Sequence, residues 1–250
     1  MRKLLSGKVA VVASGTSDVG AGVVKALLSQ DCQVIVLGQS NSEMLWLNNY
    51  VSGTLSGTLI TELSDLSDYD KINDLTDQVE EKYGPIDIAV APFDQHWIGP
   101  MLVDVEYTEW EKVLFKNLNE FFIFGKIMLQ RMQNRRNGYF ASIGDTGNLD
   151  SKPYSSLANI TASAEMSMVR IFSAEVSASN VVYHHLFINN VAGREKPHSF
   201  AGKPNWITPE MIGLHLIEMY TNQAYNRQQL YHKLLGKASQ LNEFNPNDSL

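Results

Sequence analysis

The chain has 250 residues, of which 44% are apolar and 19% are charged, and it contains a single cysteine, Cys32. This composition is typical of a globular protein and excludes disordered, collagen-like, coiled-coil and disulfide-stapled chains. The net charge of −7 argues against nucleic acid and against an anionic membrane surface as partners, because both require a basic face. No apolar run reaches the roughly 18 residues of a membrane span, and the N-terminus lacks a signal-peptide cleavage site, so we expect a cytoplasmic protein.

Short continuous apolar runs alternate with amphipathic segments along the first half of the chain. The runs at residues 9–13 and 34–37 predict strands that are buried, as in a parallel sheet, and residues 58–63 and 86–91 are predicted as a third and a fourth strand. The segments between them have apolar residues at helical spacing and predict helices over residues 23–28, 41–51 and 72–83.

The same alternation continues in the second half. Thr108 and Glu111 form a capping box that predicts a helix over residues 108–132. A second long helix is expected over residues 155–178, between strands at residues 138–143 and 181–188, and Thr208-Pro209 opens a late helix. Residues 242–250 are polar and are expected to fray. No repeat or linker divides the chain, so we predict a single domain over residues 1–250.

Strand–helix alternation over the whole length predicts an α/β fold, a doubly wound parallel sheet with helices on both faces. In such sheets, ligands bind beyond the carboxyl ends of the strands, at the switch point between the first and fourth strands. The residues that follow each strand are therefore the first candidates for a functional site.

Five short stretches occur in order along the chain: GKVAVV (7–12), DLSD (65–68), GPIDIAV (84–90), WEKVLFKNL (110–118) and TPEMI (208–212). In this order and at these spacings they resemble the short-chain dehydrogenase/reductase (SDR) family, over about residues 5–220. The resemblance implies a Rossmann-like sheet of about seven strands, an NAD(P) cofactor, and a catalytic set of Asn, Ser, Tyr and Lys.

The stretch that matches the family's cofactor turn departs from its usual pattern, Thr-Gly-x-x-x-Gly-x-Gly. Ser14 stands for the first glycine and Asp18 for the second, while Gly20 is kept and Gly15 lies at a variable position. Glycines let the backbone approach a pyrophosphate, and a carboxylate at Asp18 opposes that charge. Asp18 can also be the N-cap of the following helix. Both interpretations place an anion at the helix end that would bind phosphate.

The other positions that match the cofactor site also depart from the family or stay ambiguous. Gln39 follows the second strand and can hydrogen-bond a ribose, but it selects neither NAD nor NADP. Asp65 stands where the family's Asp meets the adenine, or it caps the helix near Asp68. The turn after the fourth strand, usually Asn-Asn-Ala-Gly, begins with Ala91 and continues through Phe93, which with Trp97 either lines an apolar pocket or only packs.

The catalytic positions differ most from the family. Asn117 matches the family's Asn, but counting from the strand at residue 138 puts the Ser position at Asp145. The Tyr position then falls on Ala158 and the Lys position on Ala162. The family's Tyr gives a proton to the substrate oxygen and needs a neighbouring ammonium to do so near neutral pH.

A rival alignment takes Tyr154 as the Tyr and Ser142 as the Ser, and it places Ala158 at the Lys position. Neither alignment provides a Tyr–Lys pair. We therefore expect an SDR-fold protein with a degenerate active site, a pseudoenzyme or repurposed scaffold that uses no cofactor. The alternatives are an NAD(P)-dependent oxidoreductase with atypical catalytic residues, and a non-redox lyase, isomerase or cyclase that uses Asp145 or Tyr154.

Two further expectations concern metals and partners. The six histidines show no metal-binding spacing, so we predict no metal site. The helix expected over residues 155–178 is apolar nearly all round, and a helix of this kind must be buried on both sides. In the resembled family the second side contacts another subunit. We therefore predict a homodimer or homotetramer, or a hetero-oligomer with a family member whose catalytic residues are intact.

Overall fold

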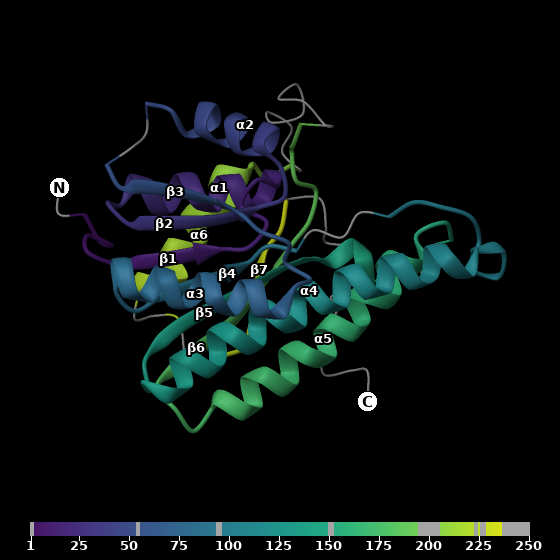
Figure 1. The fold of residues 1–250 in the computed structure, drawn as a ribbon. Helices are drawn as coiled ribbons and strands as arrows, with labels where there is room; N and C mark the ends of the chain where they lie inside the picture. The colour runs from purple at the N-terminus through teal and green to yellow at the C-terminus, as the bar shows by residue number, and fades with distance from the viewer. Residues whose placement is uncertain are drawn as a thin grey trace.

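The computed structural model describes residues 3–53, 56–93, 97–149, 153–194, 206–222, 225 and 229–236, and the statements below concern these residues. They include a seven-stranded parallel sheet with the strand order β3-β2-β1-β4-β5-β6-β7 (Figure 1). The strands are β1 (Val9–Val12), β2 (Gln33–Gly38), β3 (Thr58–Leu63), β4 (Ile88–Ala91), β5 (Gly138–Asp145), β6 (Val181–Ile188) and β7 (Tyr231–Leu234).

Helices cover both faces of the sheet, as predicted. One face packs against α1 (Asp18–Ser29), α2 (Asn41–Val51) and α6 (Pro209–Thr221). The other packs against α3 (Tyr69–Tyr83), α4 (Tyr107–Asn134) and α5 (Ser156–Val176). Two short 3₁₀ helices, η1 (Leu102–Asp104) and η2 (Thr146–Leu149), precede α4 and α5. Figure 1 shows the two long helices α4 and α5 side by side at the front of the molecule.

The strand β1 forms from an apolar run in which every side chain is buried. In β1, Ala10 and Val12 pack into the layer of α1, α2 and α6, whereas Val9 and Val11 pack into the opposite layer. This alternation explains why the run has no polar position. It confirms the doubly wound parallel sheet and puts the switch point between β1 and β4.

Two predicted helix starts are wrong. The structure begins α4 at Tyr107, after Glu106, and no side chain caps it. Thr108 therefore lies inside the first turn, where its hydroxyl cannot act as an N-cap. At α1 the N-cap is Ser17, whose hydroxyl accepts the Gly20 N–H at 3.0 Å, and Asp18 is the first helical residue. The predicted cap at Thr208 is confirmed, since its hydroxyl accepts the Met211 N–H.

Helices α1 and α6 meet backbone to backbone at Gly22. A Cβ atom at this position would lie 2.0 Å from the carbonyl oxygen of Pro209, so a side chain cannot fit without separating the helices. Within the described residues, no helix is both long enough and apolar enough to span a bilayer. The tail at 242–250, which we expected to fray, lies outside the described residues.

Candidate functional site

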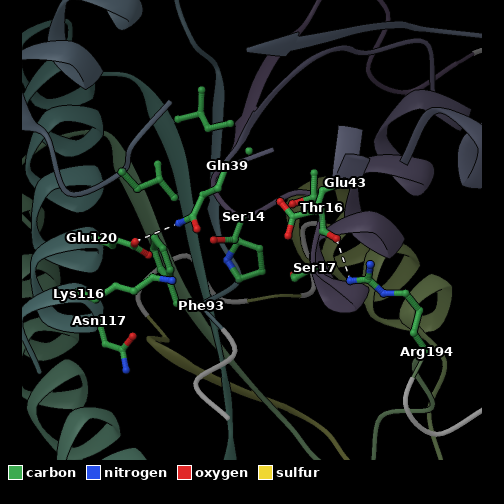
Figure 2. Close-up of a pocket in the computed structure, with 14 residues that line it drawn as sticks. Ser14, Thr16, Ser17, Gln39, Glu43, Phe93, Lys116, Asn117, Glu120 and Arg194 are labelled. Atoms are coloured by element: carbon green, nitrogen blue, oxygen red, sulfur yellow. Dashed lines mark hydrogen bonds between the residues drawn. The ribbon is translucent and has the colours of Figure 1, made fainter. Parts of the chain in front are cut away.

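A cleft of about 320 Å³ lies at the switch point, beyond the carboxyl ends of β1, β2 and β4. Its walls come from the turn after β1, the end of β2, the turn after β4, α4, and the loop after β6. Figure 2 shows the lining residues: Ser14, Thr16, Ser17, Leu37, Gly38, Gln39, Glu43, Leu66, Pro92, Phe93, Lys116, Asn117, Glu120 and Arg194. The predicted residues Ser14, Gln39 and Asn117 are therefore brought together here.

The turn after β1 owes its glycines to its own packing. A Cβ atom at Gly20 would lie 2.3 Å from the Ser14 carbonyl oxygen, and one at Gly15 would lie 2.7 Å from Val36 Cγ1. Ser14 itself has φ +47°, a left-handed conformation that favours glycine. The turn thus keeps the geometry of a glycine-rich loop while carrying a side chain at the strained position.

The carboxylate of Asp18 is bound by the loop that follows β6. Its Oδ2 accepts the backbone N–H of Arg194 at 2.7 Å, and its Oδ1 accepts the guanidinium Nε–H at 2.7 Å. Arg194 also donates to the carbonyl of Thr16 at 3.0 Å (Figure 2) and lies over the Trp46 ring, 4.0 Å from its centroid. The Asp18 carboxylate therefore lies at the positive end of α1, and it is already paired with the Arg194 guanidinium.

A second contact crosses the cleft at the end of β2. Gln39 donates from its Nε2 to Glu120 Oε1 at 3.2 Å, which joins β2 to α4 (Figure 2). Glu120 is buried, and this burial raises the pKa of its carboxyl, which the nearby Lys116 partly offsets. The Gln39 amide is therefore engaged within the chain at the place where a ribose hydroxyl would need it.

Asp65 lies outside this cleft, in a neighbouring surface hollow that also contacts Gln39 and Lys116. Its Oδ1 accepts the hydroxyl of Ser67 at 2.7 Å and the Ser67 N–H at 3.0 Å, and these bonds lower the pKa of its carboxyl. The cap of α3 is Asp68, which accepts the Lys71 N–H. The interpretation of Asp65 as the helix cap is therefore wrong: it forms the turn before the helix.

The described residues around the predicted reaction centre leave a small cavity. Asp145 ends β5 and, with Ala162 of α5, lines a cavity of about 20 Å³. This volume suffices for about one water molecule. The rest of its wall is mostly apolar and aromatic: Phe93, Phe121, Ile143, Gly144, Glu165, Met166, Val169, His185 and Phe187. Phe93 lines both the cleft and this cavity and separates them.

Asp145 and the two alanines have ordinary structural surroundings. Asp145 Oδ1 accepts the N–H of Gly147 at 2.6 Å, at the start of η2. Ala158 is buried at the start of α5, and Ala162 is half-buried one turn further along. No Tyr or Lys side chain is among the described residues that line the cavity.

The rival pair, Ser142 and Tyr154, is not brought into one cavity. Tyr154 has φ +66° and is 55% exposed, and its carbonyl accepts the Gly99 N–H. Ser142 is buried in β5. Trp97 is also removed from the cavity that Phe93 lines, because it lines neither that cavity nor the cleft, and its indole N–H donates to Glu109 at 3.2 Å.

Sequence reasoning missed a group of hydrogen-bonded polar side chains beside the small cavity. The Ser142 hydroxyl lies 2.8 Å from His185 Nδ1 and 3.2 Å from the Tyr183 hydroxyl. Burial lowers the pKa of His185 to about 3, and burial raises the pKa of Glu165 well above its ordinary value. His185 is therefore neutral near pH 7. The missing signal is register: β5 and β6 pair Ser142 with His185, and sequence periodicity does not give strand register.

Comparison with known proteins assigns the family. The sequence profile of the short chain dehydrogenases matches residues 8–180. The chain belongs to the short-chain dehydrogenase/reductase family. Among its SDR relatives, the D-beta-hydroxybutyrate dehydrogenase of Rhizobium meliloti is 21% identical over 180 residues, which is 72% of this chain and 69% of the relative. An uncharacterized oxidoreductase of Staphylococcus saprophyticus is 22% identical over 71% of this chain and 75% of its own.

A solved structure supports the SDR fold at still lower identity. L-sorbose reductase from Gluconobacter frateurii, complexed with NADPH and L-sorbose, superposes with a TM-score of 0.80. The superposition covers 94% of this chain and 98% of the reductase at 12% identity. The shared property is the fold. Within the described part of this SDR chain, no group of three or more His, Cys, Asp or Glu side chains could hold a metal ion.

Proposed function

We propose that this SDR chain does not carry out nicotinamide-dependent carbonyl reduction and is a pseudoenzyme or repurposed scaffold. The observation that carries the proposal is the small volume of the cavity beside Asp145 and Ala162. A volume of about 20 Å³ admits one water molecule but no ring, and Phe93 and Phe187 fill the space around it. A hydride donor and a carbonyl cannot meet there without displacing these side chains.

The residues at the predicted Tyr and Lys positions support the same conclusion. Ala158 has no proton to donate to a carbonyl oxygen, and Ala162 has no ammonium with which to lower the pKa of a donor. General acid catalysis of this kind is typically worth 10²–10⁴-fold in rate. Asp145, at the predicted Ser position, places a carboxylate where negative charge would develop on the substrate oxygen, and the two charges would repel.

The cofactor that the family implies does not fit the groups in the cleft. The Asp18 carboxylate is at the helix end where a pyrophosphate would bind, and Arg194 already neutralises it. The Gln39–Glu120 bond occupies the amide where a ribose would bind. A dinucleotide would have to break both contacts and bring its own negative charge beside Asp18. We therefore derive no chemical step through NAD(P).

The proposal can be tested by restoring the missing groups. In the triple variant Asp145→Ser, Ala158→Tyr and Ala162→Lys, we expect no NADH- or NADPH-dependent carbonyl reduction, because the cofactor turn is still altered. A thermal melt establishes that the variant is folded. Carbonyl reduction by the triple variant with either cofactor would show that the turn binds dinucleotide and that Asp18 was misinterpreted.

One alternative has a specific observation in its favour. The relatives named above are a dehydrogenase and an oxidoreductase, which favours an oxidoreductase with atypical catalytic residues. That alternative requires micromolar binding of NAD(H) or NADP(H) by the unaltered chain, whereas a scaffold does not. A titration of the unaltered chain with NADH and NADPH therefore distinguishes the two.

We also propose that copies of the chain associate through the outer faces of α4 and α5. Phe115 and Phe122 of α4 are 62% and 45% exposed, and Ile171 of α5 is 56% exposed. The rings of Phe122 and Phe172 stack across the two helices at 6.3 Å. Large apolar side chains gathered on neighbouring helices favour burial against a partner. Sequence periodicity predicts the same second face of α5.

A further inference from the structure

A second and larger cavity, of about 480 Å³, opens at the opposite edge of the sheet from the cleft. Its floor lies where the central strands begin: Lys8 precedes β1, Asp87 precedes β4, and Tyr139 is near the start of β5. Tyr220, at the end of α6, forms one side. The strands are parallel, so this edge carries amino ends only, and the volume falls in the range of small-molecule sites.

The walls of this cavity are aromatic and are held in place. The ring of Tyr139 is 3% exposed, and its hydroxyl lies 3.2 Å from His184 Nδ1. Tyr139 meets the His184 ring at 87° and the Tyr220 ring at 69°, with centroids 5.4 Å and 5.1 Å apart. Rings fixed by such contacts lose little side-chain entropy when a ligand binds. Tyr220 is half-buried, so its ring offers surface to which another aromatic ring can pack.

The charges on the floor neutralise each other. Lys8 Nζ donates to Asp87 Oδ1 at 2.7 Å, and Asp87 Oδ2 accepts the N–H of Val9 at 3.1 Å. Both oxygens of the carboxylate thus have a donor, while the ammonium has three N–H bonds and uses one of them on Asp87. The bond to Asp87 also raises the pKa of Lys8, so the ammonium persists. The floor therefore has no net charge, and Lys8 still has N–H groups with which to donate to a ligand.

The ion pair on the floor favours an uncharged ligand over a charged one. An anionic ligand would meet Asp87 beside Lys8, in a protein whose net charge is −7, and a cationic ligand would meet the ammonium. A neutral ligand meets neither penalty, and an acceptor oxygen on it can take a charge-assisted hydrogen bond. The rings provide the rest of the contact area.

We propose that the cavity at the amino edge of the sheet binds a small, uncharged, planar aromatic molecule that carries a hydrogen-bond acceptor, such as an aromatic ketone or amide. The ligand ring packs against Tyr220, which Tyr139 holds in place, and its acceptor oxygen takes a hydrogen bond from Lys8. This site shares no residue with the cleft and does not depend on the absence of reductase activity.

The test is an amide NMR titration of the whole chain with acetophenone as the probe. We expect saturable shifts at Lys8, Tyr139 and Thr221, with the amides of the turn after β1 unmoved. Benzoate has the same ring with a charge, and toluene has it without an acceptor. Both controls should bind several-fold more weakly, because each lacks one of the two selected properties.

Two variants locate the site. Lys8→Met keeps the aliphatic stem and should weaken acetophenone binding about tenfold, the equivalent of one hydrogen bond to a charged group. Tyr220→Leu removes the ring against which the ligand packs and should also weaken acetophenone binding. This variant tests the site even if Lys8→Met fails to fold. Lys25→Met removes an ammonium from an ion pair elsewhere and should leave the affinity unchanged. Absence of saturable shifts, shifts at the cleft instead, or tighter binding of benzoate would each overturn the proposal.

Discussion

The two edges of the sheet treat their polar groups in opposite ways. At the carboxyl edge, side chains that are distant in sequence bond to one another in or beside the cleft: Asp18 to Arg194, and Gln39 to Glu120. At the amino edge, the ion pair between Lys8 and Asp87 lies on the floor, and the volume above it stays open. Position in a fold family therefore does not by itself decide where this chain can bind a ligand.

The difference comes from which side chains have replaced small ones. A glycine at residue 18 would leave Arg194 without the carboxylate that now binds it. The inner cavity is filled in the same way by Phe93 and Phe187. These are local substitutions on an intact scaffold, so the scaffold and the site can be tested separately.

The largest effect should come from the contact that supports both edges. Helix α1 begins at the cleft and α6 ends at the amino-edge cavity, and they touch at Gly22. Gly22→Ala puts a Cβ atom 2.0 Å from the Pro209 carbonyl oxygen. We expect the free energy of unfolding to fall by about 3 kcal/mol or more. Urea denaturation measures this, and the exposed Ser163→Ala on α5 should change it by less than about 0.5 kcal/mol. Equal stability of the two variants would contradict the close approach.

The outer face of α4 and α5 should respond nearly as strongly. Phe122→Glu places a charge in the proposed subunit contact and should weaken association by about 2–3 kcal/mol, which is about a hundredfold. Light scattering after size exclusion at micromolar concentration measures the mass. Glu111→Lys, an exposed charge change in the first turns of α4, serves as the control. A monomeric mass for the unaltered chain would sink the proposal.

The buried imidazole of His185, beside the small cavity, predicts that stability depends on pH. The pKa of His185 is lowered to about 3 in the folded state, against 6.5 for the free side chain. Between these values the unfolded chain binds a proton that the folded chain does not, so stability falls as pH falls below 6.5. From pH 7 to pH 5 this residue should remove about 2 kcal/mol.

The comparison with His185→Gln isolates this contribution, because glutamine cannot titrate and still hydrogen-bonds. Glu165 has the opposite effect on stability. Its pKa is raised in the folded state, so above its ordinary pKa of 4.5 its contribution to stability falls as pH rises. Denaturation of both proteins at pH 7, 6 and 5 measures the difference. The same pH slope in the two proteins would contradict a buried, neutral His185.

The smallest effect concerns the strained turn of the cleft. Ser14 has φ +47°, so Ser14→Gly should stabilise the chain by about 0.5–1 kcal/mol, the relief of strain less the added freedom of the unfolded chain. Ser52→Gly, at φ −56°, has no such strain to relieve and should stabilise nothing. Thermal unfolding compares the two. Destabilisation by Ser14→Gly would mean that the side chain is needed in the turn.

Sequence reasoning was most accurate where one pattern spans a whole element. The predicted bounds of β3, β6 and α2 agree with the structure, because apolar runs or periodicity span the whole element. The strand β7 was not located, since Tyr231–Leu234 carries alternating polar residues and no apolar run. The N-cap of α1 was placed one residue too late, because Ser17 and Asp18 are both capping residues and lie next to each other.

The site was harder to predict because its contacts join residues that are distant in sequence. Asp18 and Arg194 are 176 positions apart, and Gln39 and Glu120 are 81 apart. Sequence counting identified Asp18, Gln39 and Asp145 as departures from the family pattern. It could not supply their partners, which depend on how the loops after β1, β2 and β6 converge.

The most direct test of the central claim is a calorimetric titration of the unaltered chain with NADH and NADPH, beside the variant Asp18→Gly. We expect dissociation constants weaker than about 1 mM for the unaltered chain, which corresponds to roughly −4 kcal/mol. Binding by Asp18→Gly alone would assign the block to that one carboxylate. Micromolar binding of either cofactor by the unaltered chain would contradict the account.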